Sequence, residues 1–315
     1  MGSSHGKAIL LGEHAVVYGA PALAIPVPGL TVTATAQLLP ASAELGEFTF
    51  TMTGSGSERV VMQTGDGLRL LASEFKKTAG ITDSPQISVR ISCGIPPGRG
   101  LGSSAACARA VVLALADLFD RRLDAGTVFD LVQISEGVAH GRASGIDTLA
   151  TGSPTPVLLS DGVAREPKMR FDSLFVIGDS GAASLTKHAV ELLQRRFTGK
   201  PGAQAEFVHR SEALTRDAVQ DLAQGRIADF GARMTACHEL LGSVGLSTDR
   251  IDALVDAALA AGSPGAKISG GGLGGCMIAL ADEPHRAAEI VTRLHKAGAE
   301  RTWVVPTGRF LFHGC

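Results

Sequence analysis

A run of glycines placed directly before an apolar helix limits the folds open to this chain. Residues 98–119 read GRGLGSSAACARAVVLALADLF, and the later part of this segment has the spacing of apolar residues typical of a helix. The alternating stretch QISVRIS, at 86–92, predicts a strand just before the glycines. The predicted order is therefore strand, glycine-rich loop, helix.

Such a loop can bind an anion. The start of a helix carries unpaired backbone N–H groups and the positive end of the helix dipole, and glycines at 98, 100 and 102 permit positive φ and close approach of a phosphate. We expect Ser103 or Ser104 to cap the helix, and a neighbouring serine hydroxyl can reach a metal on the phosphates. The alternative is a tight turn with an ordinary serine cap. The loop has no lysine of the GxxxxGK[ST] kind, so a bound triphosphate needs a cation from elsewhere in the chain.

The composition indicates a globular protein with a small-molecule partner. The 315 residues suit two domains at roughly 100–200 residues each, and the change from strand-rich to helix-rich sequence near residue 170 predicts domains at 1–172 and 173–315. A net charge of −2 gives no general attraction to nucleic acid or to an anionic membrane.

The cysteines and one long uncharged segment bear on location. Five cysteines without a CxxC pair indicate reduced thiols, and we expect a cytoplasmic protein. Residues 14–43 contain no Asp, Glu, Lys or Arg and are long enough to cross a bilayer. Four prolines and the alternating LTVTATAQL within them predict a soluble sheet instead.

The periodicity along the rest of the chain predicts further elements. Short strands are expected at 7–11 and from 30 to 63, and a loop from His140 to Pro156. The remaining predictions are helices at 125–139, 185–197, 203–224, 227–241, 248–261 and 287–297, and strands at 173–179, on both sides of the glycines at 270–275, and at 301–307.

Three charged residues supply groups that phosphoryl transfer requires. Lys7 can neutralise phosphate charge, Glu136 can hold a metal, and Asp147 can accept a proton from an attacking hydroxyl. Each has a plain alternative: a solvated lysine, a surface carboxylate and a turn-forming aspartate. His14 and His140 show no HxxxH or HExxH spacing, so a hydrogen-bonded histidine is preferred over a metal ligand for His140.

Five motifs, taken together, resemble the GHMP small-molecule kinases. They are GKAILLGEHAVVYGAPALA near the N-terminus, PPGRGLGSSAA in the glycine loop, HGRASGID after the helix carrying Glu136, DSGAASLTK at 179–187, and KISGGGLGGC near the C-terminus. They occur in the family's order over most of the chain. GEHAVVYG narrows the resemblance toward the members that phosphorylate mevalonate.

The resemblance implies a fold and a set of roles. The fold implied is a two-domain GHMP kinase fold of the α/β (α+β) class, with an N-terminal ribosomal-S5-like domain and a C-terminal ferredoxin-like domain. The cofactors are ATP and Mg²⁺, with Ser104 and Glu136 as metal ligands, Asp147 as the catalytic carboxylate and Lys7 assisting at the reacting oxygen. Glu13, His14 and Thr186 face the substrate. The nucleotide-binding loop comprises Gly98, Gly100, Leu101, Gly102, Ser103 and Ser104.

The implied reaction is transfer of the ATP γ-phosphate to the 5-hydroxyl of (R)-mevalonate, by a protein that the family suggests is a homodimer. Two alternatives remain. The acceptor can be phosphomevalonate, homoserine or a sugar, in which case Arg142 is a candidate for a phosphorylated acceptor. The chain can also be a non-catalytic ligand sensor on the same fold. Leu185, where the family usually has Ser, and Arg142 both bear on the shape of the substrate pocket.

Overall fold

The computed structural model describes residues 1–315 except 41–46, 55–56, 84, 142, 185 and 308–315, and it does not describe the side chains of 57–64. Arg142 and Leu185 therefore lie outside the described residues. The chain divides into two compact units. The first comprises Met1–Lys7, Pro26–Pro97 and Leu101–Pro154, and the second comprises Ala8–Ile25, Gly98–Gly100 and Thr155–Cys315. The predicted boundary between residues 172 and 173 stays a prediction.

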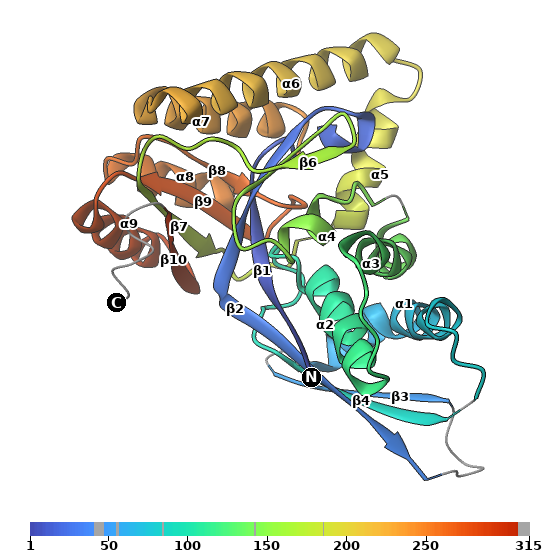
Figure 1. Ribbon diagram of the computed structural model, residues 1–315. Coiled ribbons are helices and arrows are strands. Elements are labelled where there is room, and N and C mark those ends of the chain that lie inside the picture. The colour runs from blue at the N-terminus through green and yellow to red at the C-terminus, as the bar shows by residue number, and fades with distance from the viewer. Residues whose placement is uncertain (41–46, 55–56, 84, 142, 185, 308–315) are drawn as a thin grey trace. The chain divides into compact units, whose positions relative to one another are not determined.

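The first unit packs helices against one face of a sheet (Figure 1). Its strands are the start of β1 (Gly2–Leu11), most of β2 (Ala22–Leu39), β3 (Phe48–Thr53) and β4 (Gln86–Cys93). β4 pairs antiparallel with β2 and parallel with β3. The helices are α1 (Ser57–Thr78), α2 (Ser103–Leu118), α3 (Ala125–His140) and α4 (Ile146–Ala150). Alternate residues of β4 are fully buried, since α1 and α2 cover one face of this sheet.

The second unit contains an antiparallel sheet in the order β10 (Arg301–Thr307), β7 (Ser173–Asp179), β9 (Cys276–Ala281) and β8 (Ala266–Ser269). Helices α8 (Asp249–Ala260) and α9 (Pro284–Lys296) pack on it, α7 (Ile227–Ser243) contacts β8, and α6 (Pro201–Gln224) lies along α7 (Figure 1). The remaining elements are η1 (Ala15–Tyr18), β5 (Val157–Ser160), β6 (Val163–Arg165) and α5 (Thr186–Phe197). Every residue of β7 and β9 is buried, as expected for central strands.

Most of the predicted elements are confirmed. Helices occur at α2, α3 and α5 through α9, and strands at β4 and β7 through β10. The predicted short strands from 30 to 63 are partly wrong, because β2 is one long strand and α1 begins at Ser57. In α1 a buried stripe, Leu68, Leu71, Ala72 and Phe75, packs inward at helical spacing, and this packing outweighs the β-branched residues at its start. The predicted loop from 140 to 156 contains the short helix α4.

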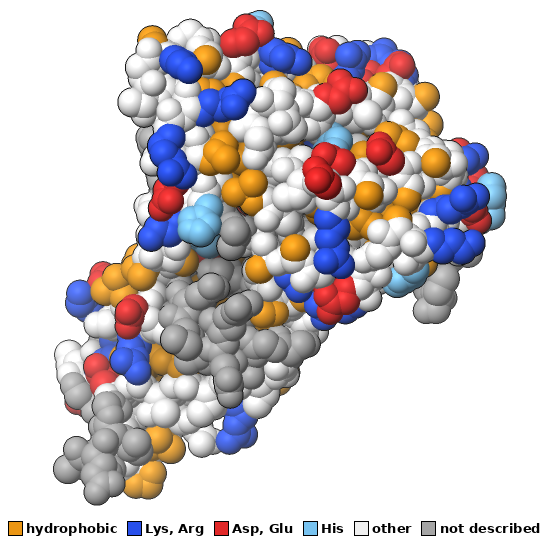
Figure 2. Space-filling model, turned by 180° about the vertical axis from the view of Figure 1, so that it is seen from behind, with side chains coloured by type: hydrophobic (Ala, Val, Ile, Leu, Met, Phe, Trp, Pro, Cys, Tyr) orange, Lys and Arg blue, Asp and Glu red, His pale blue; other side chains and the backbone are white. Residues whose placement is uncertain are grey.

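The uncharged segment is β-structure, as predicted. Residues Ala22–Ala24 of β2 pair with β5 and Val32–Leu39 pair with β4. Pro26 and Pro28 lie between these two paired stretches, so they take part in neither the β5 nor the β4 ladder. Within the described part of the chain, no helix has the length and apolar character needed to span a membrane. On the face shown in Figure 2, acidic and basic side chains are interspersed rather than gathered by sign.

Candidate active site

In the first unit, Lys7 and Asp147 form a buried ion pair. Lys7 Nζ lies 2.9 Å from Asp147 Oδ1, and the lysine side chain is 2% exposed whereas the aspartate is 34% exposed. A solvated surface lysine is therefore excluded for Lys7. The ammonium is directed at a carboxylate that solvent or a ligand can still reach, which is the arrangement needed to stabilise charge at a reacting oxygen.

The glycine loop and β1 together place the lysine. Lys7 N donates to Leu101 O at 3.0 Å, which holds β1 against the end of the loop. Gly102 has a φ of +74°, and a Cβ there would lie 2.8 Å from Lys7 Cγ and 3.0 Å from Thr151 Cγ2. A side chain at position 102 would therefore displace the lysine, so this glycine serves the catalytic pair as well as the turn.

Asp147 is held by the first turn of α4. Gly145 precedes this helix with a φ of +87°, and a Cβ there would lie 3.0 Å from the Phe129 ring. Thr148 Oγ1 donates to Gln133 Oε1 at 2.8 Å, which ties α4 to α3. The carboxylate is thus fixed by a helix whose start needs glycine, rather than by the loop that the sequence indicated.

Ser104 and Glu136 meet between α2 and α3. The Ser104 hydroxyl donates to Glu136 Oε1, and Glu136 is 3% exposed, so the surface-carboxylate alternative is wrong. Burial raises the pKa of Glu136, and the nearby Asp147 carboxylate acts in the same direction. The expected serine cap on α2 is also wrong: Gly102 occupies the N-cap position and no side chain caps the helix, because Ser103 and Ser104 already lie in its first turn. The start of α2 thus has no side-chain cap to compete with an anion.

These residues fit a magnesium ion that also binds phosphate. Mg²⁺ prefers oxygen ligands, is held in kinases by one or two protein groups plus substrate phosphates, and offsets the cost of a buried carboxylate such as Glu136. In the described residues there is no group of three or more His, Cys, Asp or Glu that could hold a metal alone. Ser104 and Glu136 would therefore supply two oxygen ligands, and the phosphates the others.

The loop residues Gly98–Gly100 belong to the second unit. Gly98 and Gly100 have φ values of +65° and +76°, as glycine-dependent turns require. Gly98 O accepts a hydrogen bond from Ser184 N at 2.7 Å. The next loop residue, Leu101, belongs to the first unit and is 1% exposed.

The three predicted substrate residues, Glu13, His14 and Thr186, also lie in the second unit. Glu13 is buried and paired with Lys267, so its carboxylate is already engaged. His14 has a φ of +58°, its Nε2 lies 3.1 Å from Gly271 O, and burial lowers its pKa to about 4, which leaves the imidazole neutral at pH 7. A Cβ on Gly271 would lie 2.2 Å from Thr186 Oγ1. Gly271 thus brings His14 and Thr186 together.

Two residues of this cluster were not among the predicted site residues. Lys267 is fully buried in β8, and Gly271 lies between the His14 and Thr186 side chains. A lysine within the short strand AKIS, which leads into the second glycine cluster, is a signal for a buried partner, although the sequence does not say which acid pairs with it.

Comparison with known proteins identifies relatives that span most of the chain. Residues 67–153 match the GHMP kinases N terminal domain and residues 218–300 match the GHMP kinases C terminal domain. The mevalonate kinase of Pyrococcus furiosus is 31% identical over 94% of this chain and 92% of its own length. That of Methanothermobacter thermautotrophicus is 28% identical over 99% of this chain and 98% of its own.

Solved structures show the same fold. The Leishmania (L. major) mevalonate kinase in complex with R-mevalonate has a TM-score of 0.81 at 23% identity, covering 97% of this chain and 96% of that one. The enzyme from methicillin-resistant Staphylococcus aureus has a TM-score of 0.71 at 28% identity, covering 96% of this chain and 97% of that one. The predicted two-domain GHMP kinase fold is confirmed. On these family matches and on its similarity to relatives over most of its length, this chain belongs to the GHMP kinase family.

Proposed function

We propose that this chain transfers the γ-phosphate of ATP to the 5-hydroxyl of (R)-mevalonate, giving 5-phosphomevalonate and ADP in an early step of isoprenoid precursor synthesis. The observation that carries the proposal is the buried Lys7–Asp147 pair, at 2.9 Å. Relatives that cover nearly the whole chain are mevalonate kinases, which supports the acceptor.

Four residues of the first unit have distinct roles in this reaction. Asp147 accepts or orients the proton of the attacking hydroxyl, and Lys7 stabilises the charge that develops on that oxygen. Ser104 and Glu136 hold Mg²⁺, which supplies charge neutralisation at the phosphate oxygens when bound. The uncapped start of α2 favours the phosphates through its N–H groups.

The second unit supplies candidates for acceptor recognition. We propose that His14 and Thr186 bind mevalonate. The neutral His14 imidazole presents a hydrogen-bonding nitrogen rather than a charge at pH 7, and the Thr186 hydroxyl is held beside Gly271. The role proposed for Glu13 in acceptor binding is an indirect one, since its carboxylate is engaged by Lys267. A homodimer and a cytoplasmic location remain predictions from the resemblance.

The alternatives differ from this proposal in acceptor or in catalysis. The phosphomevalonate kinase of Streptococcus pneumoniae has a TM-score of 0.78 at 18% identity, so the fold alone does not select between these acceptors. A non-catalytic sensor would have no use for a buried lysine paired with a partly exposed carboxylate.

The deciding experiment measures ADP release by the purified protein with Mg-ATP and, in turn, R-mevalonate, phosphomevalonate, homoserine and galactose. Mevalonate alone should support release, and Asp147→Asn should lower the rate by about 10²–10⁴ if it transfers the proton. Asp130→Asn, at an exposed position of α3, is the matched control and should retain full activity. ADP release only with another acceptor would mean that the chain is a GHMP kinase for that acceptor instead of mevalonate. No release with any acceptor would favour the sensor.

A further inference from the structure

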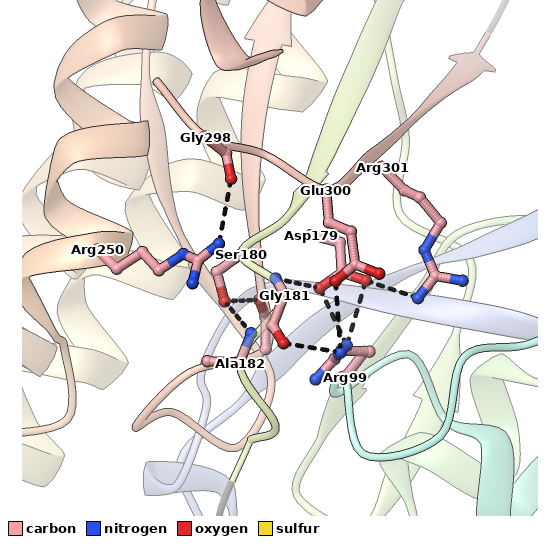
Figure 3. A network of polar contacts seen from close by, with 10 residues as sticks. Arg99, Asp179, Ser180, Gly181, Ala182, Arg250, Gly298, Glu300 and Arg301 are labelled. Carbon is pink, nitrogen blue, oxygen red and sulfur yellow. Dashed lines mark hydrogen bonds and ion pairs between the residues drawn. The ribbon is translucent and has the colours of Figure 1, made fainter. Parts of the chain in front are cut away.

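Arg99 lies in the middle of the glycine loop, and its side chain is turned into the protein. The side chain is 14% exposed, and its Nε lies 3.0 Å from Asp179 Oδ1 and 3.2 Å from Oδ2 (Figure 3). Its Nη2 donates to Gly181 O at 3.0 Å. An arginine in a phosphate-binding loop is a natural phosphate ligand, but here two of its nitrogens bind the second unit's own groups.

Asp179 is a rigid anchor for this arginine. It is fully buried at the end of β7 and pairs with Arg301 across the β7–β10 ladder. Its Oδ1 accepts from Gly181 N at 2.9 Å and its Oδ2 from Arg301 Nη2 at 3.0 Å (Figure 3). Glu300 N donates to the Asp179 carbonyl at 2.9 Å. A buried carboxylate with this many partners is fixed in place, and so is the arginine bound to it.

The loop backbone lies directly on the second glycine cluster. A Cβ on Gly100 would lie 3.0 Å from Ser269 O, and a Cβ on Gly275 would lie 3.0 Å from Arg99 O. Because neither glycine has room for a side chain, the two backbone segments lie close together and leave little space for displacement toward each other. The loop therefore has one well-defined position in the second unit. Arg99 is the one charged residue among the described loop residues 98–104, and its side chain attaches the loop to Asp179.

We propose that Arg99 is a positioning residue for nucleotide binding: through Asp179 it holds Gly98–Gly100 in the conformation that receives phosphate, and it does not bind phosphate itself. The inference rests on the proposed function, in which this loop binds ATP. A loop ordered in advance binds more tightly because less freedom is lost on binding. Displacement of a binding group by about 1 Å can cost about 10²-fold.

The test is calorimetric titration of the full chain with Mg²⁺ and a non-hydrolysable ATP analogue, without an acceptor. Arg99→Met and Asp179→Asn should each raise Kd by about 10- to 100-fold, and the double variant should raise it no more than Arg99→Met alone, because Arg99→Met already removes both the pair with Asp179 and the bond to Gly181 O. The matched control is Arg301→Met, which removes the other arginine from the same carboxylate without touching the loop. It should leave Kd unchanged.

Thermal melting of each variant separates positioning from folding. If Asp179→Asn leaves Kd unchanged or lowers it while Arg99→Met raises it, Arg99 binds phosphate directly and the proposal is overturned. A rise in Kd for Arg301→Met equal to that for Arg99→Met would also overturn it, since general destabilisation would then explain both.

Arg99→Lys decides the case if the other variants do not fold. A lysine keeps the charge but cannot bridge Asp179 and Gly181 O with a planar fork, so its Kd should be intermediate at an unchanged Tm. A wild-type Kd for this variant would contradict the proposal. Failure of the wild-type chain to bind the nucleotide would instead overturn the proposed function.

Discussion

Removal of one partner of the Glu13–Lys267 pair should destabilise the second unit strongly. The Lys267 side chain is 0% exposed and the Glu13 side chain 1%, and the lysine also donates to Ile268 O. Lys267→Met would leave the Glu13 carboxylate buried without its cation. The neighbouring Cys237 cannot replace it, because a thiol carries no positive charge; burial raises its pKa to about 12, so it stays neutral.

The magnitude follows from the burial of both charges. Loss of one partner of a fully buried ion pair costs about 3–5 kcal/mol. At roughly 2–4 °C per kcal/mol, the Tm of Lys267→Met should fall by about 6–20 °C. The double variant Glu13→Gln, Lys267→Met removes both charges and should recover much of this loss, because a buried pair can be replaced by uncharged groups at little cost.

Thermal melting followed by circular dichroism measures these shifts. The matched control is Arg293→Met, which breaks the exposed Arg293–Glu289 pair on α9 and should change stability by less than about 0.5 kcal/mol. A loss for Lys267→Met as small as that of the control would refute the reasoning. So would a double variant less stable than both single variants, since the charges would then not be coupled.

Three further predictions concern the site. The pKa of His14 falls from 6.5 to about 4 on folding, so the unfolded state binds more protons than the folded state between pH 4 and pH 6.5. The free energy of unfolding therefore decreases as the pH falls from 6.5 toward 4, by about 1.4 kcal/mol per pH unit. Melting at pH 7 and pH 5 should show a larger decrease for the wild type than for His14→Asn, and equal decreases would contradict this. Gly271→Ala places a Cβ 2.2 Å from Thr186 Oγ1. Steady-state kinetics should therefore show the KM for mevalonate raised at least about tenfold and the KM for ATP nearly unchanged. A proportional rise in both KM values would contradict a local effect. Removal of metal by EDTA should abolish ADP release. Glu136→Gln should raise the half-saturating Mg²⁺ concentration by more than about tenfold in a magnesium titration. An unchanged half-saturating concentration would exclude Glu136 as a ligand.

Local patterns predicted most of the fold because they report local energetics. Helical periodicity located α2 and α3, and the glycines at 98, 100 and 102 predicted positive φ values that the structure contains. The prediction of short strands as far as residue 63 is wrong at the start of α1, which begins at Ser57. Leu68, Leu71, Ala72 and Phe75 carried the correct signal within the sequence.

The sequence alone identified the types and order of the candidate site residues, whereas their environments arose only on folding. Nothing local to Lys7 indicates that it is buried against Asp147, 140 positions away, or that Gly102 makes room for it. Similarly, Arg99 within a phosphate-loop motif gives no sign that Asp179 holds it. Burial and charge pairing depend on which distant segments the sheets bring together. The sequence determines the polarity of each side chain, whereas the tertiary structure determines its dielectric surroundings and its partner.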